Sequence, residues 1–105
     1  MVQWQAHRSS PDVIEFAFAG KLSAEEGKRS AAHLAAALQT RNLHLVFDVR
    51  HMTAYEGRAR VAWQQTLFPY RKAILSISMR GGNSIVRLGG TVLAAALGCT
   101  IEFSK

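Results

Sequence analysis

The stretch that decides the fold class is LHLVFDVRHMTAYEGRARVAWQQTLFPY, residues 43–70. It opens with the apolar run LHLVFDV, which has the length and composition of a buried strand. We expect a turn at residues 50–53 and then a helix that ends at Pro69, since proline lacks the amide hydrogen that continues a helix. A buried strand that feeds a helix is half of a βαβ unit, so this stretch predicts an α/β fold.

Two strands and a helix are expected before this stretch. Residues 2–6 and residues 13–19 alternate apolar and polar side chains, and the turn-forming SSPD segment between them predicts an antiparallel hairpin. Ser23, with Glu26 three residues later, is typical of a capping box, and the helix it begins is expected to reach about residue 40. A narrow stripe of mostly small apolar side chains lets that helix pack closely: Ala24, Gly27, Ala31, Leu34, Ala35 and Leu38.

A strand, a helix and a final strand are expected after the deciding stretch. Residues 73–79 have a strand pattern, and the GGNS segment at residues 81–84 is a turn that can cap a helix. That helix ends at Gly98, and residues 99–103 form the last strand. Residues 1–105 are therefore expected to be one domain with the order ββαβαβαβ. Because strand–helix–strand crossovers are right-handed, this order predicts a mixed, mostly parallel five-stranded sheet, with the first strand antiparallel at or near an edge.

The two faces of the predicted strands differ in polarity. A parallel sheet that is covered on both faces has continuously apolar strands, whereas these strands alternate. We therefore expect a βα coil with its helices mainly on one face, and a second face that is wet or thinly covered. The inward set is Ile14, Phe16, Phe18, Leu45, Phe47, Leu75, Ile77, Ile101 and Phe103, and the outward set is Val13, Glu15, His44, Val46, Asp48, Ile74, Ser76, Ser78, Thr100 and Glu102.

The excess of positive over negative charge lies in the second half of the chain. The net charge is +6, yet residues 1–56 carry six basic and six acidic side chains. Residues 57–101 carry six basic side chains and no acidic one. This imbalance favours an anionic partner: an acidic protein surface, a nucleotide, a lipid headgroup or nucleic acid. The alternative is that the charge serves solubility alone.

Several classes of protein are disfavoured. There is no run of 18 apolar residues for a membrane span, and the N-terminal MVQWQAHR lacks the apolar core of a signal peptide. The single cysteine, Cys99, suits a reducing cytoplasm and is expected to be buried and inert. Because catalytic and metal-binding motifs are missing, we expect no enzyme activity, no metal and no cofactor. Asp48 and His51 are expected to share a local hydrogen bond rather than act as an acid–base pair.

The segments GKLSAEEGKRSAAHLAAAL (residues 20–38) and LHLVFDVRHMTAYEG (residues 43–57), followed by a strand, a helix and a strand, resemble the STAS domain superfamily. Its best-known members are the anti-sigma-factor antagonists, and other members are bacterial stand-alone or membrane-associated proteins. The resemblance covers nearly the whole chain. It implies a bacterial, cytoplasmic, non-enzymatic module that regulates other proteins by binding them.

The resemblance also implies where a phosphoacceptor would lie. In the antagonists, a serine at the start of the second helix is phosphorylated by a partner kinase, and the added charge breaks the complex. Asp48 aligns with the strand-end aspartate of that pattern, Glu56 with the motif aspartate and Gly57 with the acceptor serine. The acceptor is therefore absent, and Thr53 is the only hydroxyl in the preceding loop besides Tyr55. We expect the binding surface to be retained without the serine switch.

Loops at the carboxyl ends of parallel strands meet at one edge, where α/β folds usually bind ligands. Two such loops precede the second and third helices, whose free amides and dipoles favour anions. The candidate binding residues are Thr53, Tyr55, Glu56, Gly57, Arg58, Arg60, Arg80, Gly81, Gly82, Asn83 and Arg87. The first hypothesis is an acidic or amphipathic protein partner. The alternative is a small anionic ligand, a nucleotide or lipid headgroup, at the two loops.

The last predicted helix is apolar on nearly all sides. Ile85, Leu88, Gly89, Val92, Ala95 and Ala96 form one face, and Val86, Leu93 and Leu97 lie on another. Such a helix is usually buried on several sides, which indicates a partner surface, a homodimer or tight packing between helices. Nucleic acid is the weakest of the partner hypotheses, because the aromatic residues have core patterning and form no evident platform for stacking bases.

Overall fold

In the computed structural model, which describes residues 2–105, strands and helices follow the predicted order ββαβαβαβ. A 3₁₀ helix follows α2 directly and has Pro69 in its first turn. Pro69 therefore ends the α-helix but not the helical path of the chain. The elements are β1 (Trp4–Ser10), β2 (Val13–Leu22), α1 (Ala24–Leu38), β3 (Leu43–Tyr55), α2 (Gly57–Leu67), η1 (Phe68–Ala73), β4 (Ile74–Arg80), α3 (Ser84–Leu97) and β5 (Ile101–Ser104).

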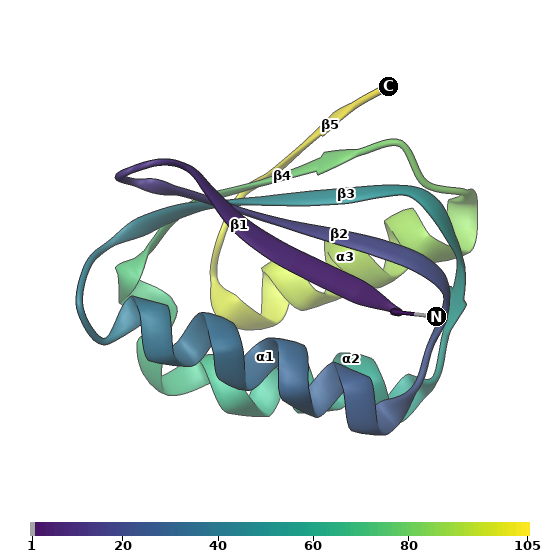
Figure 1. Ribbon diagram of the computed structural model, residues 1–105, viewed down its shortest axis with the longest axis horizontal. Helices are drawn as coiled ribbons and strands as arrows, with labels where there is room; N and C mark the ends of the chain where they lie inside the picture. Colours follow the sequence, from purple (N-terminus) through teal and green to yellow (C-terminus); the bar gives the residue numbers. More distant parts are fainter. Residues whose placement is uncertain (1) are drawn as a thin grey trace.

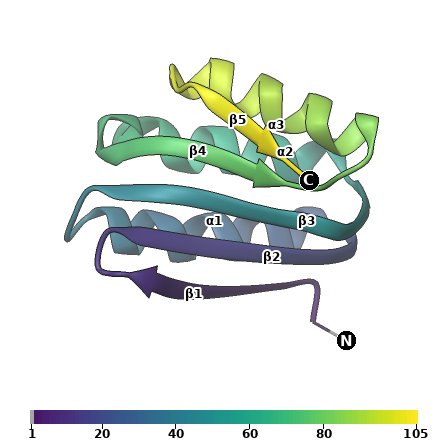
Figure 2. The same ribbon diagram turned by 90° about the horizontal axis from the view of Figure 1, so that it is seen from above.

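The five strands form one sheet in the order β1-β2-β3-β4-β5. β1 pairs antiparallel with β2 at the edge of the sheet, and the other neighbouring pairs are parallel. All three helices lie on one face, as Figure 1 shows from the side and Figure 2 from above, where the helices lie behind the strands. The predicted fold class and the one-sided helical cover are confirmed.

The core lies between the sheet and the helices. The prediction that a side chain faces this core is wrong for two residues of the inward set. Leu75 is exposed and Ile74 is buried in its place. The cause is a register shift: Leu43 pairs with Ile74 while His44 pairs with Ser76, so Leu75 is an extra residue in β4. Phe103 is also exposed, at 39%, because β5 runs away from the helices towards the C-terminus (Figure 1).

The turn predicted at residues 50–53 is wrong, because β3 continues through it to Tyr55. β2 also extends beyond its predicted end, to Leu22, and Gly20 within it has a φ of +68°. The residues after Gly20 pair with the extended part of β3. The pairing of β2 with β3 shifts register between Ala17 and Ala19 and again after Gly20. Such irregularities bend a strand and re-aim its side chains. Tyr55 therefore lies at the end of a strand, not on the face of α2.

The start of α1 follows half of the predicted capping box. The Ser23 hydroxyl accepts a hydrogen bond from the amide of Glu26 at 3.2 Å, as predicted. Glu26 does not reach back to the amide of Ser23, because the side chain of Gln3 takes that amide at 2.9 Å. The Glu26 carboxylate instead accepts a hydrogen bond from the Trp4 indole at 3.0 Å. The interaction predicted within one helix is thus replaced by a contact between α1 and β1.

Candidate functional site

The two predicted loops meet at the carboxyl edge of the sheet. The side-chain amide of Asn83 donates a hydrogen bond to the carbonyl of Thr53 at 3.0 Å, which joins the end of β3 to the start of α3. The ring of Tyr55 lies against the backbone of Gly89, where a Cβ atom would have no room. Gly81 packs equally closely on Arg50. The structure therefore brings together Thr53, Tyr55, Gly81, Gly82 and Asn83 on one edge.

Asn83 caps the helix that follows it. Its side-chain oxygen accepts a hydrogen bond from the amide of Val86 at 2.9 Å. Gly81 and Gly82 precede it with φ values of +76° and +95°, a conformation that glycine adopts readily and other residues rarely do. The RGGNS segment is thus a turn and a helix cap. Part of the hydrogen-bonding capacity of the α3 N-terminus is already used by the protein itself.

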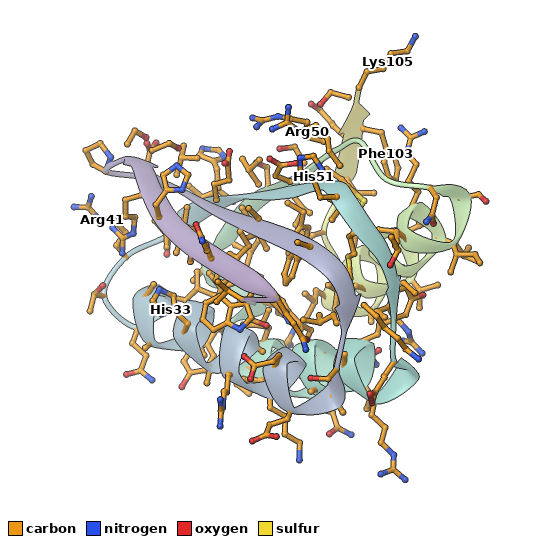
Figure 3. All side chains as sticks on the ribbon, turned by 45° about the vertical axis from the view of Figure 1, so that its right-hand side comes forward. His33, Arg41, Arg50, His51, Phe103 and Lys105 are labelled. Carbon is orange, nitrogen blue, oxygen red and sulfur yellow. The ribbon has the colours of Figure 1, made fainter. Side chains whose placement is uncertain are left out.

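Arg80 lies apart from the other predicted arginines, on the open face of the sheet. Its guanidinium is 3.4 Å from the Glu15 carboxylate and 3.9 Å from that of Asp48. Arg50 makes a two-pronged contact with Asp48, with hydrogen bonds of 2.9 and 2.8 Å. The hydrogen bond expected between Asp48 and His51 is absent from the described residues, because Arg50 takes both carboxylate oxygens. Figure 3 shows Arg50 and His51 on the side of the sheet that faces away from the helices.

The ion pair with Arg50 changes the acidity of Asp48. The hydrogen bond from the Arg50 side chain is the main cause that lowers the pKa of Asp48 from 3.8 to about 2, and burial opposes it. The same contact raises the pKa of Arg50. A carboxylate whose pKa is lowered by folding stabilises the protein above its unfolded-state pKa, and this stabilisation is lost as the pH falls through the folded-state value.

We expect acid to weaken the fold through this pair. When the pH falls from 5 to 2, the free energy of unfolding should drop by about 1 kcal/mol more in wild type than in Asp48→Asn. This value includes a reduction for solvent screening, because the Arg50 side chain is half-exposed. Urea unfolding at the two pH values measures the difference. Asp12→Asn, at an exposed carboxylate, serves as the control. An equal acid loss in wild type and Asp48→Asn would contradict the prediction.

The last helix presents an uncovered apolar stripe. Ile85 is 64% exposed, Leu88 63% and Val92 41%. These residues follow one another at helical spacing along α3. The buried face is the other one, formed by Val86, Gly89, Gly90, Leu93, Ala94 and Leu97. The residues were therefore assigned to the correct faces of α3 except for Gly89, which lies on the buried face. Only the structure shows which of the two faces packs against the core.

Arg87 lies beside this stripe and covers an exposed aromatic ring. Its guanidinium carbon is 4.6 Å from the centre of the Phe103 ring on β5, a cation–π contact. Its Nε atom is buried without a hydrogen-bond partner among residues 2–105. The contact joins α3 to β5, a role that the sequence did not indicate because the two residues are 16 positions apart.

Two solved structures share this architecture. One is an uncharacterised protein of the DUF3478 family from Shewanella loihica PV-4, described as having a SpoIIAA-like fold; its TM-score is 0.70 at 16% identity, over 95% of this chain and 82% of that one. The other is the anti-sigma factor antagonist SpoIIAA in its unphosphorylated form, with a TM-score of 0.71 at 6% identity, over 97% of this chain and 87% of that one. The chain therefore has the SpoIIAA-like fold that these two structures share. No protein-family model matches the sequence, and no curated protein matches it.

The residues aligned above with the phosphorylation motif of the anti-sigma-factor antagonists lie at the start of α2. Glu56 precedes the helix, and its carboxylate accepts a hydrogen bond from the amide of Ala24 at 3.2 Å, so it serves the start of α1. Gly57 and Arg58 are exposed. A Cβ atom at Gly57 would meet nothing within 4 Å. The space for a serine side chain is therefore present although the hydroxyl is not.

Within residues 2–105, no helix has both the length and the apolar character needed to cross a membrane. The same residues hold no group of three or more His, Cys, Asp or Glu side chains placed to bind a metal ion. On the open face, His44 has a single close polar neighbour among the described residues: its Nδ1 atom lies 2.7 Å from the Ser76 hydroxyl.

Proposed function

We propose that this STAS-like domain is a non-enzymatic regulatory module that binds a protein partner through the exposed face of α3 and the adjoining start of α2. The observation that carries the proposal is the uncovered stripe of Ile85, Leu88 and Val92. Contiguous apolar surface on a small domain is typical of interaction sites. We include the start of α2 in the proposed surface because β3 and β4 are parallel neighbours, so the helices that follow them begin at the same edge of the sheet.

Two arginines without an acidic partner set the charge that we expect of the binding partner. Arg58 is exposed at the start of α2, and Arg87 lies beside the stripe on α3. Neither makes an ion pair within 4.0 Å among the described residues, whereas Arg80 is paired with Glu15 and Asp48. A partner that presents an apolar ridge bordered by acidic side chains would complement this surface, since complementary charges speed association and select partners.

We propose that this binding is not regulated by phosphorylation of a serine at the start of α2. The aligned position is Gly57, which has no group to phosphorylate. Apart from the Tyr55 phenol, Thr53 is the nearest hydroxyl before it, and the Thr53 carbonyl accepts a hydrogen bond from Asn83. Phosphate found on Thr53, together with loss of partner binding, would show that the switch is displaced rather than absent.

A small anion at the two loops is the less favoured function. The Asn83 side chain occupies the amide of Val86, and Glu56 places a negative charge beside the start of α2. Both features compete with an incoming phosphate or carboxylate. A second copy of the chain remains an alternative occupant of the α3 stripe, and its presence is decided by the oligomeric state in solution.

The proposal is tested by removing the apolar stripe without disturbing the core. Ile85→Ser with Leu88→Ser should weaken partner binding at least tenfold, because central interface residues often cost more than 1 kcal/mol each when truncated. Val61→Ser with Leu75→Ser, at exposed apolar positions on α2 and β4, is the matched control. Affinities are measured with a partner captured by wild-type protein.

Two results would count against the proposed surface. If the double serine variant binds the captured partner as tightly as wild type, the α3 stripe is not the contact surface. If wild type sediments as a dimer and the same variant as a monomer, the stripe joins two copies of the chain. Arg58→Glu should slow association with a true acidic partner, and added salt should produce the same slowing in wild type.

A further inference from the structure

β5 forms an open edge of the sheet. Among residues 2–105 it has a neighbouring strand, β4, on one side only, and Figure 2 shows it at the edge opposite to β1. The Ser104 carbonyl accepts a hydrogen bond from the Gly81 amide at 2.9 Å, so Ser104 directs its backbone towards β4. Because successive residues of a strand direct their backbone groups to opposite sides, the N–H and C=O of Phe103 point away from β4. Such an edge is a template for a further strand.

A groove runs beside this edge, on the helical side of the sheet. Much of α3 extends outward beyond β5 (Figure 2), and Leu88 on this part of the helix is 63% exposed. Phe103 faces α3, because it aligns in register with Met79, whose side chain is buried on the same face. Residues of α3 at helical spacing, the preceding turn and β5 line the groove: Gly82, Ser84, Arg87, Leu88, Thr91 and Phe103.

Arg87 is the charged group of the groove, and the fold leaves it without an acceptor. Its side chain makes no hydrogen bond or ion pair within residues 2–105, and its Nε atom is buried there without a partner. The Phe103 ring orients the guanidinium, 4.6 Å from the ring centre. The nearest acid in the sequence, Glu102, aligns with Ser78 and lies on the other face of the sheet. A carboxylate from outside the chain would therefore complement Arg87.

We propose that β5 binds an extended segment of an acidic protein partner as an added strand, antiparallel to β5, with an acidic side chain on Arg87 and apolar side chains in the groove. Antiparallel pairing lets one residue of the segment exchange both backbone hydrogen bonds with Phe103. Side chains two residues apart share a face, so the acid and its apolar neighbours all point towards α3. This inference rests on the function proposed above and specifies the form in which the partner presents its acidic and apolar groups.

Neither a second copy of β5 nor the β1 edge offers the same complementarity. Antiparallel pairing of two β5 strands would place Phe103 of the second copy on the helical side and its Glu102 on the open face. No acid of that strand would then reach Arg87. At the other edge of the sheet, Trp4 already fills the helical side of β1 by packing on Phe16, at a ring-centroid distance of 5.9 Å.

A designed heptapeptide provides the probe. Fluorescein-labelled Thr-Val-Thr-Glu-Thr-Val-Thr-amide has strand-forming residues, with its glutamate and both valines on one face. Its fluorescence anisotropy should rise on titration with wild-type protein. Hydrogen exchange of the Phe103 amide, measured by NMR, should slow at least tenfold at saturation because that amide gains a hydrogen bond. Amides of β1 should keep their exchange rates.

The contact with Arg87 is tested by changing both partners. Replacing the glutamate of the peptide by glutamine should weaken binding to wild type about tenfold, because a charge-assisted hydrogen bond becomes a neutral one. Arg87→Gln should bind the two peptides equally, since a double-mutant cycle isolates the pair. Arg58→Gln, exposed on α2 and outside the groove, is the matched control and should still discriminate between them. Equal binding of both peptides to wild type would contradict the carboxylate contact.

The backbone pairing is tested by methylating one nitrogen at the edge. Gly98 and Cys99 form a natural ligation junction, so a thioester of residues 1–98 can be joined to a synthetic peptide of residues 99–105 with an N-methyl group on Phe103. Peptide binding should fall at least tenfold relative to ligated protein with the natural backbone, because the outward N–H is lost while the bonds to β4 remain. N-methylation of the glutamate in the heptapeptide should have the same effect and leaves the protein unchanged.

The outcomes separate this inference from the function on which it rests. It is overturned if millimolar heptapeptide changes neither the anisotropy nor the exchange of the Phe103 amide, or if N-methylation of the heptapeptide leaves its affinity unchanged. Ile85→Ser with Val92→Ser changes the α3 stripe outside the groove. If this variant loses a partner captured by wild type while Phe103 N-methylation does not, the stripe is the contact surface and strand addition is wrong.

Two further results decide the identity of the occupant. If Phe103 N-methylation abolishes binding of the captured partner and the double serine variant retains it, strand addition is supported and the outer stripe is not required. If wild-type protein sediments as a dimer and Phe103 N-methylation makes it a monomer, the β5 edge joins two copies of the chain. That result would overturn the assignment of this edge to an acidic segment of another protein.

Discussion

Trp63→Ala is expected to lower the free energy of unfolding by about 3–5 kcal/mol, the usual cost of deleting a large buried aromatic side chain. Trp63 is only 3% exposed. Its ring lies edge-on to those of Phe16 and Phe47, at centroid distances of 5.2 and 5.3 Å. The truncation would remove these contacts and enlarge the apolar cavity that Trp63 lines between the sheet, α2 and α3. Chemical unfolding followed by far-UV circular dichroism measures the loss.

Two milder variants separate packing from hydrogen bonding at this residue. The Trp63 indole donates a hydrogen bond to the Ser30 hydroxyl at 2.9 Å, and that hydroxyl donates to the carbonyl of Glu26 at 2.8 Å. Ser30→Ala leaves the indole N–H buried without this partner and should cost about 1–3 kcal/mol. Trp63→Phe should fall between Ser30→Ala and Trp63→Ala. An unchanged stability in Trp63→Ala would mean that the ring is not part of the core.

The second large effect is expected at Gly27, where alanine should destabilise the protein by about 1–3 kcal/mol. A Cβ at Gly27 would lie 2.7 Å from the Cβ and 2.8 Å from the Cα of Ala59. The Ala59 backbone must therefore move, and with it the close packing of α1 on α2. Helix propensity alone predicts the opposite sign, since alanine is favoured over glycine within a helix by about 1 kcal/mol. Thermal and urea unfolding decide between the two.

A matched control for Gly27 lies on the neighbouring helix. Gly57→Ala adds the same methyl group where nothing lies within 4 Å and should leave stability within about 0.5 kcal/mol of wild type or raise it. Gly27→Ala combined with Ala59→Gly removes the Cβ contact but retains the one with the Cα, so it should recover part of the loss. A Gly27→Ala protein more stable than wild type would show that the two helices separate easily.

The order of the elements and the one-sided cover of the sheet were predictable from local pattern. Strand alternation distinguishes a sheet with one buried face from a sheet with two, and the capping residues Ser23 and Asn83 begin their helices as expected. The short side chains along one face of α1 predicted that this helix would pack closely. These features depend on side chains within a few residues of each other, which is the range over which periodicity and capping act.

The candidate site could be predicted only as a location. The loops after β3 and β4 were expected to meet because adjacent parallel strands end on one edge, and Asn83 does reach Thr53 there. The sequence did not predict that Arg80 would turn to the open face, because its partner Glu15 lies 65 residues earlier. The two faces of α3 are both apolar, so composition alone did not indicate which one the core would take.

The sequence by itself determined the α/β class, the starts of α1 and α3, the basic second half and the absence of a serine at position 57. Only the tertiary structure decided the length of β3, the exposure of Leu75 and the cavity between α2 and α3. Strand pairing extended β3, because β2 continues past Gly20 and offers hydrogen bonds that a turn would forgo. The cavity follows from distances between helices, which depend on contacts among residues far apart in the chain and leave no periodic signal in the sequence.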